Sequence, residues 1–272
     1  MRLVTHVFEH KSRSDRWLIK PLGDIHLGSV NCDEALLDKD IQWILENDVL
    51  WAGLGDYCEF ISPKDYRFRP EDIAPWCRSE KDIAEAQLQR LIKKLGPIKH
   101  LCIGLCKGNH EDTIYDRYDN NVYARLLRYL KSNDSRIRLD TRGFIKLIFR
   151  RQTGSSKSSG KTLDIFVEHG YGGGRMEGAP ALALGRLAKN YNAKIFMEGH
   201  RHRELSMVDE RISVRGNKLV GEKLALICCG TYLKSWQPDT EIYAERKQYP
   251  PRPTGTPTIE IVPWQDEIRV TI

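Results

Sequence analysis

The 272-residue sequence has no apolar stretch that approaches the roughly 18 uninterrupted residues of a membrane-spanning helix. Its N-terminus also has no positively charged segment followed by an apolar one, so no secretory signal peptide is expected. These two absences predict a cytoplasmic protein with no membrane partner.

Cysteine occurs seven times, an odd number, and no C-x-x-C pair of the kind that binds structural zinc is present. Cys102, Cys106, Cys228 and Cys229 lie within apolar runs, where cysteine commonly serves as a small buried side chain. A disulfide framework is therefore not expected, and a reducing compartment fits this usage.

The sequence has no internal repeat and no convincing domain linker, so residues 1–272 are expected to form a single domain. Hydrophobic residues make up 40% of the chain, enough for a sizeable core. The formal net charge of +6 is modest. It is compatible with a polyanionic partner such as nucleic acid and equally with ordinary solubility. The sequence leaves the oligomeric state open.

Apolar runs alternate with segments of helical periodicity, a pattern typical of an α/β fold. Helices are expected at 33–46, with Leu45 on the apolar face, and from Ser79 to the Gly96-Pro97 stop. Strands at 205–214 and 218–229 should form a hairpin.

Two stretches are less regular. Residues 61–78 combine proline, aromatic side chains and several arginines and lysines. This composition fits either a surface loop packed by its own aromatic groups or a loop that faces a substrate. Residues 152–161, rich in Ser, Gly and Lys, are predicted to be a mobile hairpin tip.

Five polar motifs follow five of the apolar runs, in order. They are Gly23-Asp24-Ile25-His26, Gly55-Asp56, Gly108-Asn109-His110, Glu168-His169-Gly170 and Gly199-His200-Arg201-His202. Because the carboxyl ends of strands gather at one edge of an open α/β sheet, these side chains can converge. Asp24-x-His26 and His200-x-His202 would each place two side chains on one side of an extended segment.

Each motif alone is a weak signal, since D-x-H recurs by chance and a lone histidine such as His169 is commonly structural. The ordered set is more specific. It supplies carboxylate, amide and imidazole ligands, which suit Mn²⁺, Fe, Zn²⁺ or Ni²⁺. It also includes a carboxylate, Asp56, that can bridge two cations for phosphoryl chemistry.

The same motifs, extended to Gly55-Asp56-Tyr57-Cys58-Glu59 and Gly108-Asn109-His110-Glu111, resemble the calcineurin-like metallophosphoesterase superfamily. The resemblance covers about residues 17–203. It implies a four-layer αββα sandwich with a site for two divalent metal ions at its edge, Mn²⁺ being the metal we favour.

The resemblance also implies a role for each site residue. The implied ligands are Asp24, His26 and His202 for the first metal, Asn109, His169 and His200 for the second, and Asp56 for both. His110 matches the histidine that assists the leaving group, and Glu59 matches the acid that orients this histidine. The other interpretation of Glu59 is a solvated loop carboxylate.

The sequence departs from many protein phosphatases of this family at Phe60, where they have an arginine that holds phosphate. Other cations near the motifs are Lys107, Arg175, Arg201 and Arg203. Arg175 ends a glycine-rich turn that either approaches an anion through its backbone N–H groups or only connects two elements. Arg201, between two ligand histidines, either binds substrate or points away. The candidate substrate-binding residues are Asn109, Arg175 and Arg201.

These observations favour a metal-dependent phosphoesterase acting on phosphodiesters, with nucleic acid or nucleotides among the substrates. Residues 23–28 also resemble the opening motif of recombination-repair nucleases in the superfamily, although no extra DNA-binding domain follows the core. The alternative enzyme is a phosphomonoesterase on nucleotides or small molecules. The alternative class is an inactive binding scaffold, which would be expected to have lost ligands or His110.

Overall fold

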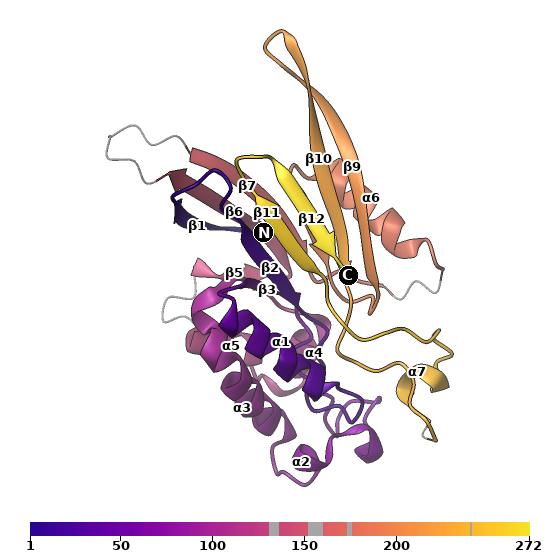
Figure 1. Ribbon diagram of the computed structural model, residues 1–272. Helices are drawn as coiled ribbons and strands as arrows, with labels where there is room; N and C mark the ends of the chain where they lie inside the picture. The colour runs from indigo at the N-terminus through magenta and orange to yellow at the C-terminus, as the bar shows by residue number, and fades with distance from the viewer. Residues whose placement is uncertain (131–135, 152–159, 173–175, 240) are drawn as a thin grey trace.

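The computed structural model describes residues 1–130, 136–151, 160–172, 176–239 and 241–272 (Figure 1). Its centre consists of two mixed β-sheets. The described strands are β1 (Arg2–His10), β2 (Trp17–Leu22), β3 (Leu50–Gly53), β4 (Cys102–Cys106), β5 (Arg138–Asp140), β6 (Arg142–Arg151), β7 (Gly160–Glu168), β8 (Ile195–Glu198), β9 (Glu204–Arg215), β10 (Lys218–Cys229), β11 (Thr258–Val262) and β12 (Glu267–Thr271).

One sheet has the order β1-β6-β7-β8-β10-β9, and the other has the order β12-β11-β2-β3-β4-β5. In the second sheet β2, β3, β4 and β5 run parallel, whereas β11 is antiparallel to both β2 and β12. In the first sheet β7, β8 and β10 run parallel, and β9 is an antiparallel edge strand. The parallel strands carry most of the predicted site motifs at their carboxyl ends.

The described helices lie outside the sheets (Figure 1). They are α1 (Glu34–Glu46), α2 (Pro75–Arg78), α3 (Ile83–Leu95), α4 (Asn109–Tyr118), α5 (Val122–Leu130), α6 (Ala179–Asn190) and α7 (Tyr243–Arg246), with 3₁₀ turns at Pro70–Asp72 and Gly96–Leu101. Figure 1 shows α1, α3 and α5 together beside the β2–β3 part of the second sheet, and α6 against the β9–β10 hairpin.

Buried side chains alternate between clusters along the strands, as the two-residue period of a strand requires. In β3, Trp51 packs with residues of α1, α3 and α5, whereas Leu50 and Ala52 join a cluster drawn from both sheets. In β7, Ile165 joins that shared cluster, and Phe166 packs with Leu184 of α6. Both sheets are thus buried on two faces in the region that supports the site.

Backbone hydrogen bonds join the loops that follow these strands. The N–H of Asp24 donates to the carbonyl of Gly55 at 3.0 Å, and that of Ile25 donates to Asp56 at 2.9 Å. The N–H of Gly199 donates to Glu168 at 3.3 Å, linking the loops after β7 and β8. The predicted convergence of strand ends is confirmed.

Two details of the sequence prediction are wrong, and both have local causes. The second helix begins at Ile83, because the side chain of Asp82 accepts from the N–H of Glu85 and caps it. Ser79 instead follows the short helix α2. Leu45 is exposed, since α1 turns only Leu37, Ile41 and Ile44 inward. The predicted β9–β10 hairpin and the burial of the four cysteines are confirmed.

Residues 61–78 contain a 3₁₀ turn and α2. Phe68 and Trp76 pack against a small buried cluster that includes Ile73, as expected for a segment packed by its own aromatic groups. Of the predicted hairpin tip 152–161, residues 152–159 lie outside the described residues, and 160–161 begin β7. Among the described helices none is long and apolar enough to cross a membrane.

Candidate metal centre

Five of the seven predicted metal ligands have unusual backbone angles. Positive φ angles occur at Asp24 (48°), His26 (50°), Asp56 (50°), His200 (66°) and His202 (49°). Non-glycine residues adopt this region infrequently, and each instance costs on the order of 1–3 kcal/mol that surrounding contacts must offset. The expectation that Asp24-x-His26 and His200-x-His202 are extended is therefore wrong. Tight turns, not strand alternation, bring these side chains together.

The side chains form two adjoining groups that could each hold a metal ion. In the first, Nε2 of His202 lies 3.2 Å from Nε2 of His26 and 3.4 Å from Oδ1 of Asp24. In the second, Nε2 of His169 lies 3.3 Å from both Oδ2 of Asp56 and Nδ1 of His200. The predicted division of these histidines between two sites matches this arrangement.

Asp56 lies between the two groups. Its Oδ2 is 3.3 Å from Nε2 of His169 and 4.0 Å from Nε2 of His26. Asn109 joins the second group, because its Oδ1 is 3.1 Å from Nε2 of His169. The carboxylate is thus placed where a ligand shared by two cations would have to be.

The chemistry of this donor set fits divalent cations. Oδ1 of Asp24 is buried and has no hydrogen-bond partner among the described residues, although a buried carboxylate oxygen normally has one. The Nδ1 atoms of His26 and His169 face the carboxylate of Glu59 and the carbonyl of Leu54, which can only accept, so these nitrogens carry the protons. Their Nε2 atoms are left to bind a cation. The residues therefore fit two metal ions with nitrogen and oxygen ligands.

A third possible metal group consists of His26, Glu59 and His110. It shares His26 with the first group, and Nδ1 of His26 is already used in its 3.0 Å hydrogen bond to Glu59. Nδ1 of His110 donates to the backbone carbonyl of Glu59 in a short contact. The nitrogens of His26 and His110 that face Glu59 therefore carry protons, so they cannot bind a cation beside it. The third group is thus a poorer cation site than the other two.

Glu59 has a different target from the one predicted. Its carboxylate contacts His26, a metal-ligand candidate, and only its backbone carbonyl contacts His110. A carboxylate behind a ligand histidine fixes the tautomer and increases the basicity of the ligating nitrogen. The nearby Asp56 lies 4.0 Å from Nε2 of His110. Burial lowers the pKa of His110, but Asp56 and Glu59 together outweigh this effect and raise it.

The electric field of the carboxylates separates the histidines into two kinds. Burial lowers the pKa of His169, but Asp56 and Asp24 outweigh it and raise that pKa to about 10. Burial and the neighbouring His169 lower the pKa of His200 to about 4. Burial also lowers the pKa of His26. Without a metal, the imidazole of His169 is therefore doubly protonated and positively charged near neutral pH, whereas that of His200 is neutral.

Glu111 supports the centre, a role that the sequence analysis did not assign. Its carboxylate accepts the backbone N–H groups of Asp56, Tyr57 and Gly108 at 2.9, 2.9 and 2.7 Å. Burial and the charge of Asp56 raise its pKa to about 7. Its position three residues after the helix cap at Gly108 was the available signal. A β-carbon at Gly108 would lie 2.1 Å from Oδ1 of Asp56, so only glycine fits there.

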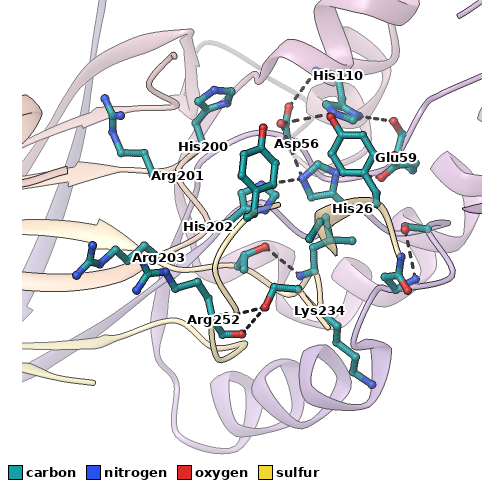
Figure 2. A pocket seen from close by; sticks show the side chains of 18 of the residues that line it. His26, Asp56, Glu59, His110, His200, Arg201, His202, Arg203, Lys234 and Arg252 are labelled. Carbon is teal, nitrogen blue, oxygen red and sulfur yellow. Dashed lines mark hydrogen bonds and ion pairs between the residues drawn. The ribbon is translucent and has the colours of Figure 1, made fainter. Parts of the chain in front are cut away.

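A cavity of about 310 Å³ opens over the two groups (Figure 2). Its lining includes His26, Asp56, Asn109, His110, His200 and His202. Figure 2 shows Arg203, Lys234 and Arg252 on the side away from His110 and Glu59. The metal groups are thus open to a ligand through this cavity.

The predicted substrate cations are mostly engaged with acids. Arg201 lines the cavity, but its Nε donates to the buried carboxylate of Glu198 at 3.0 Å. Lys107 forms a short ion pair with Asp112. Arg203 pairs with Glu177 at 2.6 Å. Arg175 lies outside the described residues.

The sequence analysis missed the C-terminal wall of the cavity. Thr231 Oγ1 donates to the carbonyl of Asp24 at 2.8 Å, and the N–H of Tyr232 donates to the same oxygen at 3.0 Å. The chain then lines the cavity with residues between Leu233 and Arg252. No polar motif marked this segment, so only the fold reveals its proximity.

The scan against protein-family models and the search of curated proteins found no match. Solved structures give remote likenesses. A conserved uncharacterized protein from Streptococcus pneumoniae TIGR4, described as a predicted phosphoesterase, is 14% identical with a TM-score of 0.37, over 91% of this chain and 84% of that chain. GAP50, the anchor in the inner membrane complex of Plasmodium, is 13% identical with a TM-score of 0.41, over 90% and 81%. Likeness this low carries no functional argument, so function must be argued from the site.

Metal binding should release at least one proton per chain at pH 8. The pKa of His169 is about 10 without metal, and a ligand must lose its proton before it binds a cation. Apparent affinity for Mn²⁺ should accordingly rise as the pH increases from 6 to 9. Calorimetric titration in buffers of different ionisation enthalpy measures the proton count. Metal binding without proton release would show that His169 does not carry a second proton at pH 8.

Proposed function

We propose that this protein is a phosphohydrolase of the calcineurin-like metallophosphoesterase type, with a dinuclear metal centre and the four-layer αββα arrangement of that superfamily. The observation that carries the proposal is the pair of nitrogen and oxygen ligand groups that meet at Asp56. The clusters buried on both faces of each sheet support the four-layer arrangement.

When bound, two such cations supply Lewis acidity at the phosphoryl oxygens and lower the pKa of a water molecule. Asp24, His26 and His202 would hold one cation, Asn109, His169 and His200 the other, and Asp56 both. The remaining work falls to side chains that orient and protonate. The carboxylate of Glu59 keeps the proton of His26 on Nδ1, and the backbone carbonyl of Leu54 does the same for His169.

His110 is suited to donate a proton to the leaving group. Its Nδ1 proton is committed to the carbonyl of Glu59, so Nε2 is the nitrogen that can exchange a proton with a substrate. That nitrogen lies on the side of Asp56, beside the cavity. A charged imidazole there can protonate a departing oxygen without being a metal ligand.

His110→Ala should leave the metal content unchanged and lower kcat by roughly 10²–10⁴-fold, the usual range for general acid–base catalysis. The loss should be smaller for a substrate with a less basic leaving group, which needs less protonation. Metal analysis and steady-state kinetics on two aryl esters measure both effects. Loss of a metal ion in this variant would make His110 a ligand instead.

We further propose that phosphodiesters are preferred to monoesters. A monoester dianion needs a dedicated cation, but Phe60 is buried where many family phosphatases have an arginine. Arg201 and Arg203 are held by Glu198 and Glu177. A diester has a single negative charge, which two metal ions can largely neutralise. Nucleic acid is one such diester, and its binding would weaken steeply with salt.

With Mn²⁺ bound, kcat/KM should be higher for an aryl phosphodiester than for the matching monoester. The same preparation should be assayed on single-stranded and duplex DNA and RNA at two salt concentrations. Asp56→Asn should lower metal occupancy and abolish all hydrolysis. A strong monoester preference without salt-sensitive nucleic-acid binding would favour the phosphomonoesterase. Two bound metals without hydrolysis of any ester would favour the binding scaffold.

A further inference from the structure

One buried polar side chain in the cavity lacks a partner and is not among the proposed metal ligands. Asn31 is 4% exposed and lines the cavity. Its Oδ1 has no hydrogen-bond partner among the described residues. The backbone of Asn31 is fixed, because its carbonyl accepts from the N–H of Lys234 at 2.9 Å and its N–H donates to Ser29. A buried amide oxygen held in this way can accept a hydrogen bond from a ligand in the cavity.

The cavity also has two aromatic side chains that the proposed hydrolysis does not use. Tyr243 and Tyr249 both line it, with 39% and 40% of their surfaces exposed. Their ring centroids are 6.5 Å apart at an angle of 55°. Partly exposed tyrosines in a cavity offer flat apolar faces on which a planar ring can stack.

Ion pairs hold in place the aromatic wall, the part of the cavity lining that contains Tyr243 and Tyr249. Arg246 of α7 forms a short ion pair with Asp72 of the 61–78 segment. Arg252 pairs with Glu177, which also contacts Arg203. The wall is therefore tied to two other segments that border the cavity, and its tyrosines stay beside the metal centre.

The cavity is larger than a phosphoryl group requires. Its volume of about 310 Å³ is at the lower end of the range of roughly 300–1,000 Å³ for small-molecule sites. Arg69 lies on its lining and is exposed, so it can meet a further phosphate. Lys234 also lines the cavity and pairs with Asp33 at 3.7 Å. These walls would therefore bind a ligand that has a planar ring, a hydrogen-bond donor and a phosphate.

We propose that this part of the cavity binds the nucleoside portion of a phosphoester. The base stacks on Tyr249 with Tyr243 beside it, and Oδ1 of Asn31 accepts a hydrogen bond from a hydroxyl or amino group of the nucleoside. The inference rests on the proposed phosphoesterase function, which places the reacting phosphate at the metal groups. A free dinucleotide and the end of a nucleic-acid strand share this chemistry.

Ligand binding to the Mn²⁺-loaded protein tests the inference directly. Calorimetry should show that a nucleoside monophosphate binds at least about tenfold more tightly than inorganic phosphate, since stacking on an aromatic side chain contributes about 1–3 kcal/mol per base. Ribose 5-phosphate should bind more weakly than the nucleoside monophosphate. Equal affinity for the nucleoside monophosphate and either of the other two ligands overturns the inference.

Single substitutions test which side chains bind the nucleoside. Asn31→Ala and Tyr249→Ala should each lower the affinity for the nucleoside monophosphate by roughly tenfold and leave that for phosphate unchanged. Tyr249→Phe should retain the affinity, because stacking needs only the ring. Tyr129→Ala is the matched control, since Tyr129 is 41% exposed but lies on α5 outside the cavity lining. An equal loss in the control overturns the assignment.

Hydrolysis separates this inference from the proposed function. Asn31→Ala should lower kcat/KM by roughly tenfold on a dinucleoside monophosphate or a short single strand, and by less than about twofold on methyl p-nitrophenyl phosphate. Comparing the dinucleotide with the strand identifies which source is preferred. Selective nucleotide binding without hydrolysis of any ester would overturn the proposed function alone. Hydrolysis of the methyl ester without selective nucleotide binding would overturn the nucleoside inference alone.

Discussion

The buried carboxylate of Glu111 is the contact on which the arrangement of the site depends. It accepts three backbone N–H groups, from Asp56 and Tyr57 after β3 and from Gly108 after β4. Charge-assisted hydrogen bonds of this kind are among the stronger ones in proteins. Because the loops after β3 and β4 are joined there, Asp56 is fixed between the two ligand groups and His110 is fixed beside it. The N–H of His110 in turn donates to Oδ1 of Asp56 at 2.9 Å.

The surrounding structure holds the site in a conformation that is unfavourable in isolation. Several ligand candidates have left-handed backbone angles, and the imidazole nitrogens of His26 and His202 approach to 3.2 Å. Burial also opposes ionisation of Asp24 and Asp56, although neighbouring histidines lower the pKa of both. Such local costs concentrate at functional sites, where the rest of the fold offsets them. Cations between these groups would replace the contacts among these side chains with ligand bonds.

The sequence predicted the convergence of the strand ends that carry the motifs, because short polar motifs after apolar runs report chain position directly. The division of the ligands into two groups was implied by the resemblance to the superfamily. The sequence could not predict which neighbour each side chain contacts. The carboxylate of Glu59 faces His26, and the loop that carries it has a positive φ of 47° at Phe60. The cavity wall around Tyr243 was also not predictable, since its proximity to the site comes from the return of the chain past Asp24. Asn31 was missed because a lone asparagine has no distinctive spacing.

The central claim is that two cations share Asp56. Anomalous diffraction from a crystal of the Mn²⁺-loaded protein tests it most directly. The account predicts two anomalous peaks about 3.5–4 Å apart, both in contact with Asp56, with His26 and His202 at one and His169 and His200 at the other. A single peak, or a peak held by His26, Glu59 and His110, would contradict it.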